Sequence, residues 1–72
     1  MSPASHVRVA VELTDSEAWE LAQLIKRIRF DQVAQLTEGG QSRQDREDQA
    51  YRMIYALDRV GRALREEGYA PR

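Results

Sequence analysis

The chain has no cysteine among its 72 residues, and His6 is its one histidine. These absences exclude disulfides, thiolate metal ligands and a histidine-rich metal site. A chain of this length buries only about 60% of the surface that its unfolded form exposes, so it needs an additional source of stability. Because disulfides and metals are excluded, we expect no cofactor, and we expect oligomerisation to supply that stability.

Long hydrophobic runs and an excess of charge of one sign are also missing. No apolar run approaches the ~20 residues that a membrane helix requires, and residues 1–5 lack the charged and hydrophobic regions of a signal peptide. We therefore expect a soluble, cytoplasmic protein that does not bind membranes. The formal net charge is −1, which weighs against nonspecific nucleic-acid binding because phosphates attract a surplus of Lys and Arg.

What is present begins with an alternating segment at residues 6–13. One side of this segment carries Val7, Val9, Val11 and Leu13, and the other side carries His6, Arg8, Ala10 and Glu12. This period of two predicts a half-buried β-strand. No second segment of the chain offers to pair with it, and a lone strand cannot satisfy its backbone groups. We therefore predict that Val7, Val9 and Val11 mark a strand that pairs with its copy in a homodimer.

The rest of the chain has helical periodicity. Thr14 and Glu17 have the spacing of a capping box, which predicts a helix from residue 15 to about residue 29. A second helix is predicted from about residue 42 to residue 67, ended by Gly68. Between them, residues 30–41 either extend the first helix by two turns or form an irregular connector, with a break at residues 37–40.

These elements predict a single α+β domain of β-α-α order at residues 6–68. Residues 1–5 are predicted to be a flexible N-terminal tail and residues 69–72 a C-terminal tail. Gly61 lies within the apolar stripe of the second helix, where it would allow another helix to approach closely. The predicted core consists of the large apolar side chains of all three elements: Val7, Val9, Val11, Leu13, Leu21, Ile25, Ile28, Met53, Ile54, Leu57, Val60 and Leu64.

Catalytic equipment is lacking. Nucleophilic catalysis needs a Ser, Cys or Thr beside a base that a third group holds in place. His6 next to Ser5 in an N-terminal tail does not provide this arrangement. Gly39 and Gly40 are not followed by the Lys and Ser or Thr of a phosphate-binding loop. The sequence therefore predicts a protein that is not an enzyme.

A candidate partner-binding surface lies on the polar side of the second helix. Tyr51, Tyr55, Arg59 and Arg62 fall opposite the apolar stripe, and Tyr and Arg are the residue types that dominate interaction hot spots. Trp19 of the first helix is similarly off its apolar stripe. The alternative is that these aromatic side chains cover the rim of the core, with Trp19 packed on Tyr69 or Pro71.

A DNA-binding alternative comes from the order strand, helix, turn, helix, which resembles that of ribbon-helix-helix regulators. Those dimers insert a two-stranded ribbon into the major groove. The outward residues of the ribbon and the start of the second helix would supply the DNA contacts, namely Arg8, Ala10, Glu12 and Arg43. Against this, the connector at residues 30–41 is long, and acidic side chains at the start of the second helix would repel a phosphate.

Two blocks of sequence carry a family resemblance. Residues 13–23 with the following Lys26 and Arg27, residues 63–72, and the apolar stripe between them resemble a family of short proteins found on bacterial phages and integrative or conjugative elements. About half of the chain takes part, and residues 30–48 do not. The resemblance implies a protein that binds and inhibits or modulates a host protein complex, as anti-CRISPR inhibitors do. It implies no catalytic or binding residue.

Overall fold

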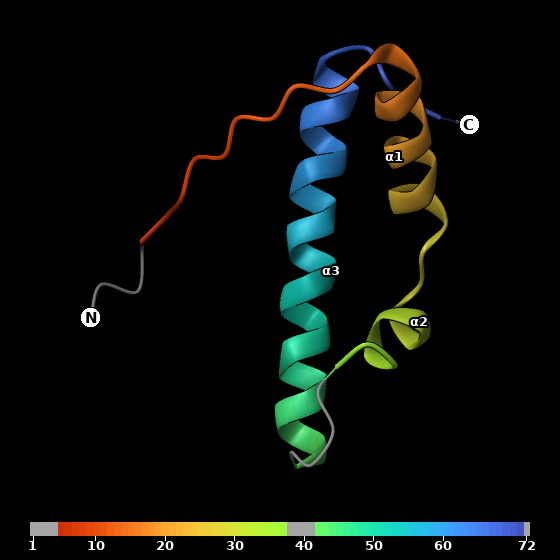
Figure 1. The fold of residues 1–72 in the computed structure, drawn as a ribbon. Coiled ribbons are helices and arrows are strands. Elements are labelled where there is room, and N and C mark those ends of the chain that lie inside the picture. The colour runs from red at the N-terminus through yellow and green to blue at the C-terminus, as the bar shows by residue number, and fades with distance from the viewer. Residues whose placement is uncertain (1–4, 38–41, 72) are drawn as a thin grey trace.

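The computed structural model describes residues 5–37 and 42–71, and this part of the chain is built from helices (Figure 1). The elements are α1 (Asp15–Arg27), α2 (Phe30–Ala34) and α3 (Arg43–Glu66). The long helix α3 contacts both of the others. Helix α1 runs antiparallel to α3 along its C-terminal half, and α2 lies beside its N-terminal half.

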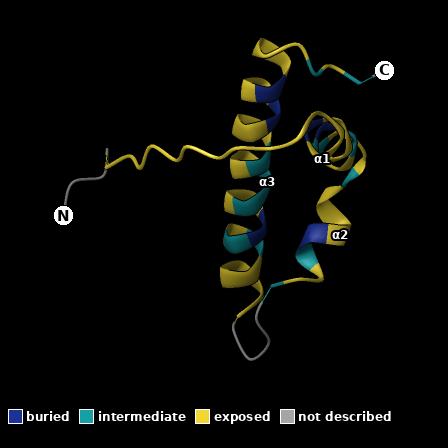
Figure 2. Ribbon diagram, turned by 45° about the horizontal axis from the view of Figure 1, so that its top comes forward, coloured by how far each residue is buried: buried dark blue, intermediate teal, exposed yellow. Residues whose placement is uncertain are grey.

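The prediction of an α+β fold of β-α-α order is wrong, because the described residues contain no strand. Residues 5–14, which we call the N-terminal arm, are extended; the arm crosses the C-terminal half of α3 and continues beyond it (Figures 1 and 2). A strand needs a neighbour to exchange backbone hydrogen bonds, and no second extended segment runs beside the arm in the described ranges. The predicted strand of Val7, Val9 and Val11, paired with its copy, is therefore not part of this fold.

Helix α1 begins with the predicted capping box. The Thr14 hydroxyl accepts from the Glu17 amide at 3.1 Å, and the Glu17 carboxylate accepts from the Thr14 amide at 2.9 Å. The hydrogen bond from the Thr14 amide, and after it the Thr14 side chain, lower the pKa of the Glu17 carboxyl group because they favour its charged form. The helix ends at Arg27, two residues before the predicted end, because Ile28 is extended (φ −70°, ψ 139°).

The connector does not extend the first helix, so that alternative is wrong; in its described part it is irregular except for one short helix. The chain is extended at Ile28 and Arg29, and it then forms the single short helix α2. The Arg29 amide donates to the Gln32 side chain at 2.9 Å, which starts this helix. Val33 is buried and anchors α2 to the rest of the molecule. Thr37 closes a turn on Ala34, and the remainder of the predicted break, residues 38–40, lies outside the described residues.

Helix α3 begins and ends where the sequence predicts. The Ser42 hydroxyl accepts from the Asp45 amide at 3.1 Å. At the other end Gly68 has φ +100°, its amide donates to the Arg65 carbonyl, and the Tyr69 amide donates to the Leu64 carbonyl at 2.9 Å. This is a Schellman motif, in which a glycine takes the left-handed conformation and the last carbonyls are satisfied.

The core is smaller than predicted and consists mainly of small side chains. Buried apolar residues lie on the sides of the helices that face one another (Figure 2), and they are Ala18, Ala22, Val33, Ala50 and Leu64. Of the predicted core, Leu64 is buried, the other helix residues except Val60 are half-buried, and the arm residues and Val60 are exposed. The prediction failed because the helices meet through small residues rather than large ones. A Cβ at Gly61 would lie 2.9 Å from Ile25 Cγ2, which confirms the predicted close approach.

The end of the chain packs against α1. Tyr69 lies against the cluster of Ala18, Ala22 and Leu64, and its hydroxyl donates to Asp15 Oδ1 at 2.7 Å. This hydrogen bond to a carboxylate raises the pKa of Tyr69 because it stabilises the protonated phenol. Further along, Lys26 Nζ donates to the Pro71 carbonyl at 2.8 Å. The segment predicted to be a tail therefore holds α1 against the end of α3.

Candidate functional surface

Three exposed aromatic rings form a continuous row across α2 and α3. Phe30 lies 4.7 Å from Tyr51 between ring centroids, and Tyr51 stacks on Tyr55 at 6.0 Å. Phe30, Tyr51 and Tyr55 are 36%, 47% and 61% exposed. We call these three residues the aromatic row. Its order follows from the helix, since Tyr51 and Tyr55 are one turn apart and the extended residues before α2 bring Phe30 beside them.

Arginines flank the aromatic row on α3. Arg52, Arg59 and Arg62 are exposed, and Arg62 Nη2 contacts Asp58 Oδ2 at 3.1 Å on the helix surface. Asp48 lines the same hollow as Arg52, so the charges beside the aromatic row are of both signs. The structure therefore brings together the predicted residues Tyr51, Tyr55, Arg59 and Arg62, as their spacing requires.

Sequence analysis did not assign Phe30 to this surface. The residue lies in the segment whose conformation was left open, so its neighbours could not be inferred. The signal that was available is composition: an aromatic residue directly after the predicted end of the first helix, followed by the polar residues Asp31 and Gln32. Its ring extends the tyrosine pair across the gap between α2 and α3.

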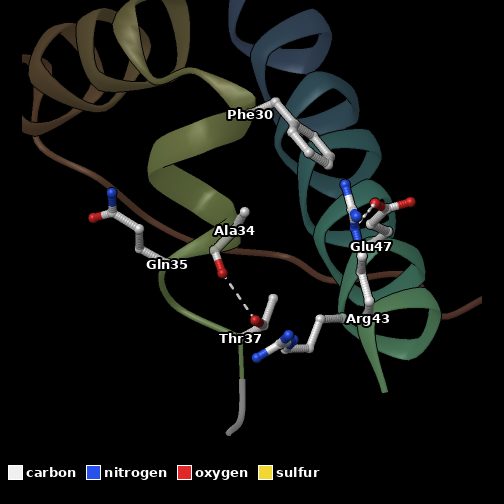
Figure 3. A pocket seen from close by; sticks show the side chains of 7 residues that line it. Phe30, Ala34, Gln35, Thr37, Arg43 and Glu47 are labelled. Carbon is white, nitrogen blue, oxygen red and sulfur yellow. Dashed lines mark hydrogen bonds and ion pairs between the residues drawn. The ribbon is translucent and has the colours of Figure 1, made fainter. Parts of the chain in front are cut away.

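An open groove continues from the aromatic row toward the start of α3 (Figure 3). Its volume is about 420 Å³, and it is lined by Phe30, Ala34, Gln35, Thr37, Arg43, Arg46 and Glu47. Arg43 Nε contacts Glu47 Oε1 at 3.3 Å across one helical turn, and the Thr37 hydroxyl donates to the Ala34 carbonyl at 2.8 Å. The groove is thus a mixed apolar and polar surface next to the rings.

Trp19 lies on a different part of the molecule. Its ring packs edge-on against Tyr69, with centroids 5.1 Å apart and an angle of 74° between the planes. It is not close to the aromatic row: Trp19 is in the first turns of α1, while the row lies beside α2. The alternative of packing on Tyr69 matches this geometry, and a contact of Trp19 with a partner stays a prediction.

The residues predicted for DNA contact are not brought together in one chain. Arg8, Ala10 and Glu12 are exposed on the N-terminal arm, which crosses the C-terminal half of α3. Arg43 is at the opposite end of that helix and is paired with Glu47. The acidic residues Asp45 and Asp48 also lie in the first turns of α3.

The described residues contain no group of three His, Cys, Asp or Glu side chains placed to hold a metal ion. The shifted pKa values of Glu17 and Tyr69 arise from contacts that close a helix end and dock the chain terminus. Among the helices of the described ranges, none combines the length and apolar character needed to cross a membrane.

The fold and its surfaces define a small helical protein with an exposed aromatic row. By sequence, the chain belongs to a family of unknown function (DUF7706), whose model matches residues 1–72. Comparison with curated proteins and with solved structures gave no match.

Proposed function

We propose that this protein acts by binding another protein through the aromatic row and its flanking arginines, and that it is not an enzyme. The observation that carries the proposal is the row itself, in which Phe30, Tyr51 and Tyr55 contact one another yet stay exposed. Aromatic rings offer a large contact area with few rotatable bonds, so little conformational entropy is lost when binding orders them.

The flanking charges indicate the chemistry of the partner. Arg52, Arg59 and Arg62 are exposed on the same helix as the two tyrosines, and Arg59 carries no ion pair to the acidic residues that contact Arg43 and Arg62. A complementary protein would place carboxylates around an apolar or aromatic centre, because charge complementarity steers encounter and selects partners. In the mobile-element setting that the sequence resemblance implies, this partner would be part of a host complex that binding inhibits or modulates.

The test is affinity capture from bacterial lysate with the tagged protein, with and without nuclease, followed by mass spectrometry. We expect a stoichiometric protein partner that survives nuclease. With that partner purified, Tyr55→Ala should weaken binding by at least about 30-fold, the loss typical of a hot-spot residue. The melting temperature should stay nearly unchanged, because surface substitutions usually alter stability by less than about 0.5 kcal/mol.

Glu66→Ala is the control, since Glu66 is exposed at the end of α3, about 16 Å along the helix from Tyr55, and should bind normally. A partner that binds wild type and Tyr55→Ala equally would contradict the proposal. The DNA-binding alternative stays a prediction, and the same experiment addresses it. Recovery of DNA that is lost with Arg8→Ala and with rising salt would favour that alternative.

A further inference from the structure

Two apolar grooves on the other side of α3 join into one surface. One is lined by side chains of the arm, α1 and α3, including Val11, Leu21 and Val60. The other is lined by side chains around α2, including Ile28, Leu36 and Val60. Val60 belongs to both grooves, and Leu24 lies on α1 between Leu21 of the first groove and Ile28 of the second, which directly follows the helix. We call this surface the open face, defined by Val9, Val11, Leu24, Leu36, Leu57 and Val60.

The open face leaves large side chains in water. On the arm, Val7, Val9 and Val11 are 86%, 73% and 68% exposed; on the helices, Leu24, Leu36 and Val60 are 55%, 69% and 43% exposed. Without Val7, which lines neither groove, these residues and Leu13 expose on the order of 600 Å², so a patch that meets its copy would bury roughly 1,200 Å², the lower end of a stable interface. A contiguous apolar patch of this size marks an interaction site.

The shape of the chain agrees with a missing neighbour. The Cα radius of gyration is 14.2 Å, whereas a compact chain of this length has one of about 11 Å. The projecting arm and the single layer of helices account for the difference. Outside the described ranges, Met1 is the one large apolar side chain in the sequence. Within the described ranges, no segment of the chain covers this surface.

We infer that a second copy of this chain covers the open face, in a dimer that packs helix face against helix face with the two arms included. The interface is independent of the proposed function. A small chain with so few buried side chains needs this cover throughout its lifetime. Other copies of the chain are present wherever the protein is made. In a two-fold dimer each patch faces an identical patch, so the apolar surface of one copy meets the apolar surface of the other.

The dimer leaves the aromatic row free. Val60 and Tyr51 are nine residues apart on α3, which places them about 180° apart around the helix at about 100° per residue. Partner binding and dimerisation would therefore use opposite sides of α3. A dimer would present two aromatic rows on its outer surfaces.

Sedimentation equilibrium of the full chain, from low to high micromolar concentration, tests the inference. We expect twice the 8.3 kDa mass of one chain, with a melting temperature that rises with protein concentration. Val60→Asp should raise the dissociation constant by at least about 100-fold, because a charge would be buried without a partner twice per dimer. The matched control Tyr55→Asp, on the opposite side of the same helix, should stay dimeric.

Val9→Asp provides a second variant that cannot unfold the helices, since Val9 is on the projecting arm. It should also weaken the dimer. A wild-type monomer at all concentrations would overturn the inference, and so would unchanged dimers in both Val60→Asp and Val9→Asp. A monomer that gains a stable complex with a different protein through Val60 would assign the open face to that protein instead.

Discussion

The two sides of the α1–α3 pair differ in the size of their apolar residues. Where the helices face each other, the contact is made by Ala18, Ala22, Gly61 and Leu64, and these residues are buried. On the open face, the side chains are larger and lie largely in water. Small residues let backbones approach closely and so become buried within one chain. Large apolar residues on a single layer of helices have nothing opposite them. The difference shows that residue size, as well as hydrophobicity, decides which stripe one chain can bury.

The largest expected effect comes from placing a larger side chain in the contact between α1 and α3. In Gly61→Val, the added Cβ would meet Ile25 at 2.9 Å and its methyl groups would press further into α1. We expect a loss of about 3 kcal/mol from overpacking, which corresponds to a fall in Tm of roughly 15 °C for a domain of this size. Thermal unfolding followed by circular dichroism measures this. Arg52→Val, at an exposed position of α3 outside both helix contacts, is the control and should cost about 0.5 kcal/mol through helix propensity. Equal losses in both variants would contradict the close contact.

Two leucine substitutions, with effects of intermediate size, compare the α1–α3 contact with the open face. Leu64→Ala removes a buried side chain, and we expect it to cost about 2–3 kcal/mol at every protein concentration. Leu24→Ala removes the same atoms from the open face, so its cost should depend on concentration and be smallest when the protein is dilute. Denaturant unfolding at two concentrations, compared between the variants, tests this difference. If both losses were independent of concentration, Leu24 would have no role in association.

The smallest expected effect concerns the docked end of the chain, which closes the α1–α3 contact. The hydrogen bond to Asp15 raises the pKa of Tyr69, so it stabilises the fold while the phenol is protonated. This stabilisation is complete below the ordinary tyrosine pKa of 10.0 and is lost as pH rises through the higher folded-state pKa. Tyr69→Phe should lower Tm slightly at neutral pH and should remove this part of the alkaline loss. An identical alkaline profile in wild type and Tyr69→Phe would mean that the hydrogen bond does not contribute.

Local signals in the sequence predicted the helix ends well. The capping box at Thr14 and the left-handed glycine at Gly68 each depend on a few adjacent residues, and each is confirmed. The connector was not predictable, because Ile28 and Arg29 leave the helical conformation so that Val33 can pack as a buried side chain. The spacing of residues in the sequence does not predict that the helix will end early so that one later side chain can be buried.

The candidate surface was predicted in part for the same reason. Tyr51, Tyr55, Arg59 and Arg62 are on one helix, so their common side follows from a period of 3.6 residues. Phe30 joins them from another element, and only the packing of α2 on α3 brings it there. The alternation at residues 6–13 was read as a strand, but pairing needs a neighbour that the described chain does not provide.

The sequence by itself determined where α1 begins, where α3 begins and ends, which side of α3 is polar, and that a glycine would sit at a close helix contact. These properties arise from interactions within a few residues along the chain. The tertiary structure alone decided that small rather than large residues form the core, that Phe30 completes the aromatic row, and that the arm and the open face stay exposed. These properties depend on which surfaces meet, and that is set by contacts between residues far apart in the sequence.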